Sequence, residues 1–195
     1  YETERREFSK VVMRASNQNA GEVFAIVNEA MKGRWDAAAE LVHSSRRASS
    51  NAGLDLGYVY PEGAFVPDSG RMPGGAVPPD DFAPRAVPGA RAPHAPAVRN
   101  GSPVSLLDLF GGKWVLLAGR EGTGWREAAD FVEVLVSRAD FDCDGFEEIY
   151  ETGLGGAVLV RPDGIVASCW KEMVPSASIA VHACLQHLLH PPDIR

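Results

Sequence analysis

Prolines crowd the middle of this chain and limit what can fold there. Ten of the fourteen prolines in the 195-residue sequence lie between Pro61 and Pro103, together with several glycines. Proline lacks an amide donor and fixes φ, so this stretch cannot form a helix or a central strand of a sheet. It predicts an ordered crossing over a protein surface, with a flexible linker as the alternative. Within it, mobility is expected at Asp68 to Asp81.

The region before the crossing, residues 1–53, is predicted to be helical, with a break at Ser16–Gly21. Apolar residues recur there at helical spacing. They form three sets: Phe8, Val11, Val12 and Ala15; Val23, Ile26, Val27, Ala30 and Met31; and Trp35, Ala38, Leu41 and Val42. These helices have large apolar faces and no sheet to cover, so their partner is expected to be missing N-terminal sequence or another subunit. Residues 54–101 are predicted to hold a short strand, Leu54–Tyr60, and then the proline- and glycine-rich crossing.

Residues 102–195 show an α/β pattern. Apolar runs predict buried strands at Lys113–Ala118 and Ala157–Val160. Arg161–Gly164 predicts a tight turn, because proline suits its first central position and glycine the left-handed one, and a second strand follows at Ile165–Trp170. The order of elements is compatible with a thioredoxin-like layout.

Helices are predicted between and after these strands. Apolar residues at helical spacing indicate one helix through Trp125, Ala128, Val132, Leu135 and Val136. Phe141–Tyr150 is predicted to be a strand or an irregular segment. Ser176 or Ser178 can cap a last helix. Its inward face would be formed by Val181, Cys184, Leu185 and Leu188.

The cysteines do not predict redox chemistry. A thioredoxin-type enzyme places its thiol just after the first central strand, at a helix N-terminus, but Gly119–Trp125 contains no cysteine. Cys143, Cys169 and Cys184 form no Cys-x-x-Cys pair, which argues against a disulfide framework or a zinc ribbon. They are expected to be ordinary thiols in a reducing cytoplasm.

Other candidate sites also have ordinary explanations. Gly119–Gly124 lacks the motifs of a nucleotide-binding loop and is expected to be a loop before a helix. The C-terminal histidines with Asp193 are too few for a metal centre, and Asp142–Gly145 departs from a calcium loop. A net charge of −7 argues against nucleic-acid binding, and no apolar run approaches the ~20 residues that span a membrane. No catalytic, cofactor-binding or metal residue is therefore predicted.

Four groups of residues carry a family resemblance. They are Tyr1–Arg6; Leu56–Tyr60 with Val66–Asp68; Pro88–His94 followed by Ser105–Gly111; and Leu159–Gly164 with Val166–Ala167. In this order they resemble the C-terminal region of the FAD-dependent aromatic hydroxylases, the flavoprotein monooxygenases related to para-hydroxybenzoate hydroxylase and phenol hydroxylase. The most similar branch contains the chlorophenol and polyketide hydroxylases.

The resemblance implies a C-terminal fragment of an enzyme that uses FAD and NAD(P)H to hydroxylate a phenolic or polyketide aromatic substrate. Residues 1–53 would be a helical remnant of the FAD and substrate domain, and residues 102–195 a thioredoxin-like domain that lacks the redox cysteines. The family's flavin motifs would all lie before Tyr1. The fragment is therefore expected to bind no cofactor, to be inactive alone, and to pack against the missing N-terminal flavin-binding domain, with a homodimer possible.

Arg91 and His94 are predicted to anchor the junction between the two regions. Both are donor-rich and lie in a path fixed by proline, so hydrogen bonds to backbone carbonyls or a carboxylate are expected. The alternative is a solvated pair in a linker. A second hypothesis for the whole chain is a stand-alone thioredoxin-like module for interaction or dimerisation. A third is a thiol oxidoreductase, which requires a cysteine of low pKa.

Overall fold

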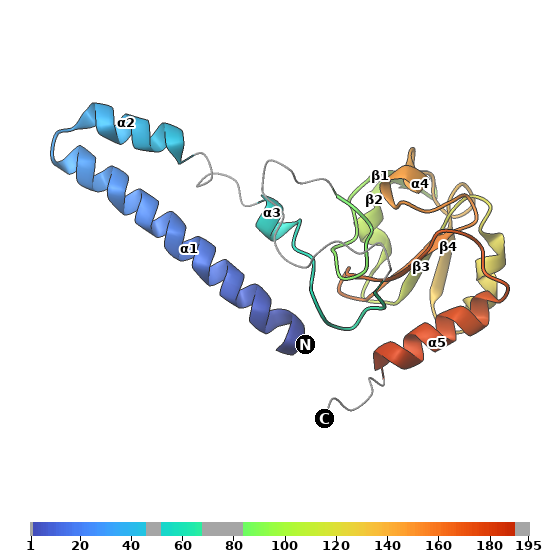
Figure 1. Cartoon of the computed structure of the whole chain (residues 1–195). Helices are drawn as coiled ribbons and strands as arrows, with labels where there is room; N and C mark the ends of the chain where they lie inside the picture. Colours follow the sequence, from blue (N-terminus) through green and yellow to red (C-terminus); the bar gives the residue numbers. More distant parts are fainter. Residues whose placement is uncertain (1, 46–51, 68–83, 190–195) are drawn as a thin grey trace, which may run out of the picture. The chain divides into compact units, whose positions relative to one another are not determined.

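The computed structural model describes residues 2–45, 52–67 and 84–189 (Figure 1). The described residues up to Tyr58 form one compact unit, and those from Val59 onward form a second. The predicted mobile stretch from Asp68 to Asp81 lies outside the described residues. The second unit contains every strand named below.

The first unit is built from helices. α1 (Glu2–Met31) and α2 (Trp35–Ser44) pack side by side as a hairpin that turns at Gly33, where φ is 75° (Figure 1). The predicted break at Ser16–Gly21 is wrong, because α1 is continuous. A single glycine costs a helix only about 1 kcal/mol, and the helical hydrogen bonds on both sides of Gly21 outweigh it.

The predicted strand at Leu54–Tyr60 is also wrong. A short helix, α3 (Ala52–Asp55), takes its first residues, and turns and bends follow. Val59 alone makes an isolated β-bridge, to Ala90. Gly53 and Gly57 flank the apolar residues of this segment, and glycine weakens a strand because it has no side chain to pack.

A four-stranded sheet forms the centre of the second unit. Its strands are β3 (Val115–Ala118), β4 (Glu133–Val136), β5 (Ala157–Val160) and β6 (Val166–Trp170). Their spatial order is β4-β3-β5-β6; β3 runs parallel to β4, whereas β5 is antiparallel to both β3 and β6. All residues of β3 and β5 are buried, as the apolar runs predicted.

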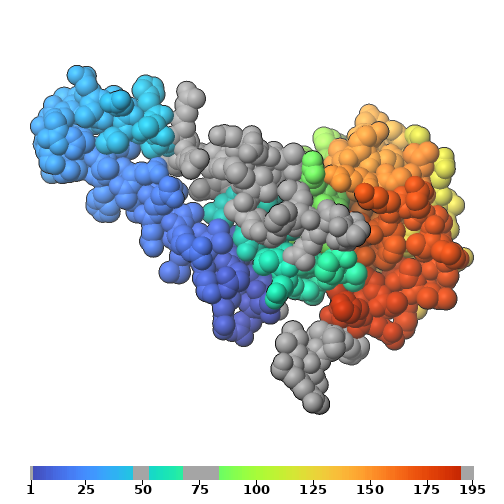
Figure 2. Space-filling model, viewed as in Figure 1, coloured from blue at the N-terminus to red at the C-terminus, as the bar shows by residue number. Residues whose placement is uncertain are grey.

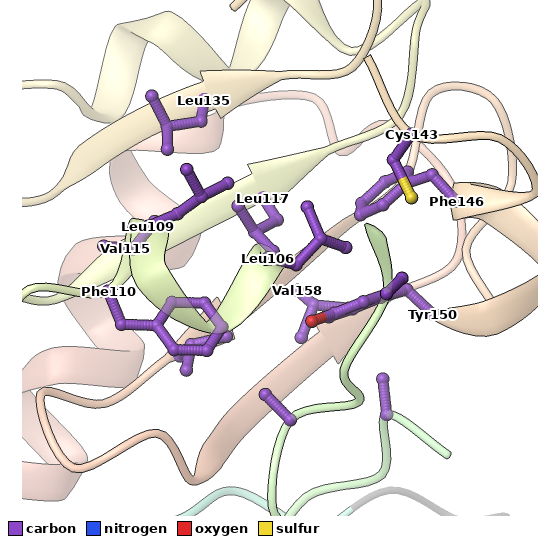
Figure 3. Packing of buried hydrophobic residues seen from close by; sticks show 14 of the residues in the cluster. Leu106, Leu109, Phe110, Val115, Leu117, Leu135, Cys143, Phe146, Tyr150 and Val158 are labelled. Atoms are coloured by element: carbon purple, nitrogen blue, oxygen red, sulfur yellow. The ribbon is translucent and has the colours of Figure 1, made fainter. Parts of the chain in front are cut away.

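Each face of the sheet has its own core. Val115 and Leu117 point to one face, which is covered by η3 (Leu106–Leu109) and α4 (Phe146–Ile149). Figure 3 shows the side chains of this cluster, with Tyr150 beside Val158. The alternate residues of β3 point to the other face, against η4 (Thr123–Ala128) and α5 (Ala177–Leu189). The alternation follows from the two-residue period of a strand.

The predicted helix from Trp125 to Val136 is wrong. The chain makes the 3-10 helix η4 and then the strand β4, whose Val134, Leu135 and Val136 are buried. Apolar residues on both faces of a short buried strand also match helical spacing, so periodicity alone could not separate the two. At Phe141–Tyr150 the irregular alternative is closer than the strand, because α4 forms there.

Two further elements complete the second unit. β1 (Pro96–Arg99) and β2 (Ser102–Ser105) form a hairpin at the end of the proline-rich stretch.

The turn after β5 is confirmed: the amide of Gly164 donates to the carbonyl of Arg161 at 2.9 Å, and Gly164 has φ of 81°. The inward face predicted for α5 is buried, and the Ser176 hydroxyl accepts a hydrogen bond from the Ile179 amide.

Candidate functional site

The proline-rich path ends in a segment that pairs with the edge of the sheet. This crossing segment, residues 84–95, lies along β6. The Gly89 amide donates to the carbonyl of Val166, and the Val166 amide donates back to Ala90, both at 2.9 Å. An unpaired edge strand offers a row of free donors and acceptors that invites aggregation. The crossing segment covers part of this edge, so it is an ordered part of the second unit.

Two side chains from the sheet unit bind the same segment. The buried Tyr150 hydroxyl donates to the carbonyl of Pro93 at 2.8 Å, and the Cys169 thiol donates to the carbonyl of Ala86 at 3.1 Å. Burial raises the pKa of Tyr150 well above its usual value of 10, so the phenol remains a donor. Both contacts satisfy carbonyls of a segment that has few regular hydrogen bonds.

Gly89 fits the crossing segment for a steric reason. Its φ is 89°, a conformation that other residues rarely adopt. A Cβ atom at this position would lie 2.9 Å from the Tyr60 carbonyl oxygen and 3.0 Å from the ring of Phe65. The Tyr60 amide also donates to the Gly89 carbonyl at 2.9 Å. Gly89 therefore allows a close approach of two backbone segments.

The two predicted junction residues have different surroundings. Nδ1 of His94 lies 2.8 Å from Oγ of Ser105, which caps η3. Arg91 is exposed, and its backbone forms a bridge with Ile165. Among the residues that the structure describes, its guanidinium has no hydrogen-bond partner. The anchoring role of the Arg91 side chain thus stays a prediction.

The glycine-rich loop after β3 does not fit a phosphate group. Two of its amides are already used: Gly119 donates to Gly156, and Glu121 donates to Leu154, each at 2.9 Å. A Cβ atom on Gly119 would lie 2.4 Å from the Leu154 carbonyl oxygen. The glycines permit close backbone packing with the loop before β5. A phosphate cradle needs free amides that converge on the ligand, so these residues do not fit the pyrophosphate of FAD.

Trp125 reinforces the closed arrangement of these loops. Its indole Nε1 donates to the carbonyl of Gly155 at 2.8 Å, and its ring packs against Trp170 with 5.1 Å between centroids. Trp125 is fully buried. The loops at this end of the sheet are therefore bound to each other.

The thiols lie away from this loop and are poorly suited to nucleophilic chemistry. Cys143 and Cys184 are buried, and Cys169 is partly buried. Burial raises the pKa of Cys184 to about 11, although a hydrogen bond with Ser168 acts in the opposite direction. Burial, and then the charge of Asp144, raise the pKa of Cys143. A thiolate is the reactive form, and these shifts disfavour it.

Metal and membrane sites receive no support from the described part of the chain. No group of three or more His, Cys, Asp or Glu side chains there could hold a metal ion. His182 packs against Phe131 instead, with 5.0 Å between ring centroids, and His190 lies outside the described residues. No helix within residues 2–45, 52–67 and 84–189 is both long and apolar enough to cross a membrane.

Comparison with protein families gives a match over the second unit. Residues 85–192 match the family described as "Aromatic-ring hydroxylase, C-terminal". Aklavinone 12-hydroxylase RdmE of Streptomyces purpurascens is 38% identical over 116 residues, which are 54% of this chain and 22% of that protein. A putative polyketide hydroxylase of Streptomyces coelicolor is 37% identical over 138 residues, which are 62% of this chain and 21% of that protein. The chain thus spans about a fifth of these relatives.

Solved structures extend the likeness to almost the whole chain. Aklavinone-11 hydroxylase in a ternary complex with FAD and aklavinone is 28% identical, with a TM-score of 0.74; the match covers 97% of this chain and 34% of that one. The flavin-dependent monooxygenase PieE, in complex with FAD and substrate, is 33% identical with a TM-score of 0.65, and covers 83% of this chain and 29% of that one.

Proposed function

Because the chain belongs to the family of C-terminal regions of aromatic-ring hydroxylases, we propose that it is the C-terminal part of an FAD-dependent monooxygenase that hydroxylates a phenolic or polyketide aromatic ring. The observation that carries this proposal is the match of 97% of the chain to one third of an FAD-containing aromatic hydroxylase. NAD(P)H would be the reductant. FAD and substrate would bind in the part of the enzyme outside this chain.

The second unit would be a thioredoxin-like domain without thiol chemistry. A parallel pair β3-β4, an antiparallel hairpin β5-β6, and the order β4-β3-β5-β6 support this assignment. So do η4 and α5 on one face and α4 on the other. The loop at the place of a thioredoxin thiol contains Gly119 and no cysteine, and its amides bind the loop before β5. Three free thiols also fit a cytoplasmic enzyme.

The role proposed for the second unit is structural and non-catalytic. The crossing segment precedes the sheet in the sequence, and the hydrogen bonds from Tyr150 and Val166 hold it along β6. We propose that His94 adds to this junction through the hydroxyl of Ser105, whereas the expected partner was a backbone carbonyl or a carboxylate. Arg91 is the second residue that we propose to anchor the junction.

Flavin content tests the proposal directly. The 195-residue chain and the polypeptide encoded by the complete reading frame that contains it would be purified in parallel, and flavin absorbance would be measured for each. The longer polypeptide should retain FAD and oxidise NAD(P)H in the presence of an aromatic substrate, and the shorter chain should do neither. FAD bound by the shorter chain, or a longer polypeptide without flavin, would contradict the proposal.

Thiol titration separates this proposal from a thiol oxidoreductase. The thiol of Cys184 should titrate near pH 11, because burial disfavours its thiolate. Cys143 should also titrate above its usual value of 9.0. The measurement is the rate of alkylation by iodoacetamide at each cysteine as a function of pH, read by peptide mass spectrometry. A cysteine that alkylates rapidly at neutral pH with a low pKa would support the oxidoreductase instead.

A further inference from the structure

α1 carries exposed apolar side chains along one face. Its large exposed members are Val12, Met13, Val23, Phe24, Val27 and Met31. At 100° per residue they fall within one sector of the helix, which also contains Ser16 and Ala20 and no charged residue between Val12 and Met31. Phe24 is 74% exposed and Met31 84% exposed. We call this set of residues the α1 stripe.

The partner helix α2 does not cover the α1 stripe. Half-buried residues of α1 such as Glu22 and Ile26 lie outside this sector of the helix. α2 adds exposed apolar side chains of its own, with Trp35 69% exposed and Val42 54% exposed. The hairpin, which is blue in Figure 2, therefore presents several large apolar side chains to solvent in this chain. Contiguous exposed apolar surface on a protein marks a place where another surface binds.

The hairpin has a counterpart within a larger protein. The family match begins at residue 85, so the hairpin lies before the C-terminal region that defines the family. Yet the FAD complex of aklavinone-11 hydroxylase matches 97% of this chain, which must include most of the hairpin, and the chain is only 34% of that structure. A counterpart of the hairpin thus exists inside a polypeptide about three times as long.

We propose that the α1 stripe is the docking surface for the flavin-binding body of the same polypeptide, with Phe24, Val27 and Met31 at its centre. This inference rests on the proposed function. The occupant must present an apolar surface, because the α1 stripe offers no charge for a polar partner to bind. A second copy of the chain is the competing occupant.

Site-directed labelling tests the assignment. Phe24→Cys and Met31→Cys would be made in the 195-residue chain and in the polypeptide of the complete reading frame. Arg14→Cys is the matched control, because Arg14 is an exposed residue of α1 on the polar side of the helix. Each protein is treated with N-ethylmaleimide, and the rate at each engineered cysteine is read by peptide mass spectrometry at two protein concentrations.

In the 195-residue chain, all three cysteines should react at similar rates. In the longer polypeptide, the cysteines at positions 24 and 31 should react at least about tenfold more slowly, because only local opening would expose them, and the control should change little. Equal rates at position 24 in both proteins would overturn the inference. Protection in the 195-residue chain that grows with protein concentration would mean that a second copy covers the α1 stripe. That result would also overturn the inference.

The two proposals can fail separately. Flavin absorbance of the longer polypeptide reports on the proposed function whatever the labelling rates are. A yellow, active enzyme with fast labelling at positions 24 and 31 would overturn the docking surface and leave the proposed function intact. The wild-type chain supplies the background, because Cys143 and Cys184 are buried.

Discussion

The first and last helices of this chain use their apolar residues in opposite ways. α5 places Val181, Cys184, Leu185 and Leu188 against one face of the sheet, and all four are buried. α1 is more than twice as long, with 30 residues against 13, yet most of its large apolar side chains, including Phe24 and Met31, are exposed. α5 has a sheet to cover, whereas α1 packs against the short helix α2 and, through Phe8, against Tyr58. Amphipathic sequence alone therefore does not bury a helix; a complementary surface must also be present.

Replacing one aromatic residue by alanine in α1 and one in the second unit should give the largest difference in the free energy of unfolding. Phe146→Ala should lower the free energy of unfolding of the second unit by about 3–5 kcal/mol, because the fully buried ring packs on Phe141 and Tyr150. Phe24→Ala should change the free energy of unfolding by less than about 0.5 kcal/mol, because an exposed side chain leaves no cavity. Urea unfolding followed by tryptophan fluorescence and by circular dichroism measures both.

Similar losses of stability in the two variants would contradict the difference in burial between α1 and the second unit. A large loss for Phe24→Ala that depends on protein concentration would mean that the chain buries Phe24 against a second copy. Met31→Ala is the confirming variant, because Met31 is also exposed on α1.

Replacement by alanine should change stability in opposite directions at Gly119 and at Gly21. Gly119→Ala should destabilise the second unit by about 1–3 kcal/mol or more, because the new methyl group would meet the Leu154 carbonyl at 2.4 Å. Gly21→Ala should stabilise α1 by about 1 kcal/mol, because nothing lies within 4 Å of the added atom and alanine favours a helix. Thermal unfolding and helical circular dichroism report the two changes, and a neutral Gly119→Ala would show that the loops are not closed.

The crossing segment should depend on its hydrogen bond from the phenol of Tyr150. Tyr150→Phe removes the hydrogen bond to the Pro93 carbonyl and should cost the second unit about 1–2 kcal/mol. Hydrogen exchange should also rise at the amides of residues 86–95, because the segment loses one of its attachments. Unchanged stability and exchange would exclude Tyr150 as an anchor.

The sequence predicted elements whose signals were local and unambiguous. Ala157–Val160, the turn at Gly164 and the last helix each combine an apolar pattern with a specific turn or cap residue. The hairpin β1-β2 was missed although it has such a signal: Asn100 and Gly101 have φ of 52° and 75°, and Asn-Gly is typical of a two-residue hairpin turn. The strand β4 was mistaken for a helix because its pattern fits both.

The candidate site was less predictable, because its contacts join residues distant in the sequence. His94 and Arg91 were found from the proline-fixed path, but no local pattern pairs Tyr150 with Pro93 or Cys169 with Ala86. Such contacts depend on how the chain packs as a whole. The closed glycine loop is a similar case: its glycines indicated a loop, and only the packing against Leu154 shows why they are glycines.

The smallest expected effect concerns the ion pairs at the edge of the sheet. Partial burial alone would raise the pKa of Glu133, but hydrogen bonds from Lys113 and Arg99 outweigh it and hold the pKa below 4.5. This stabilisation is complete above the unfolded-state pKa and is lost as the pH falls through the lower folded-state pKa. Glu133→Gln should therefore cost less than about 1 kcal/mol near neutral pH and nothing at strongly acidic pH.

Urea midpoints measured from neutral to acidic pH check the role of Glu133. Glu7→Gln is a control, because Glu7 lies on α1 and should leave the second unit unaffected. A difference between Glu133→Gln and the wild type that grows as the pH falls would contradict the assigned direction of the pKa.

Hydrogen exchange of the 195-residue chain tests the central contrast most directly. The amides of β3 and β5 should exchange only on global unfolding of the second unit, because both strands are buried and paired on both sides. The amides of α1 should exchange at least about 100-fold faster, because local opening of a helix with an uncovered apolar face suffices. Exchange of α1 as slow as that of β3 would contradict the account, because it would mean that the chain already buries the α1 stripe.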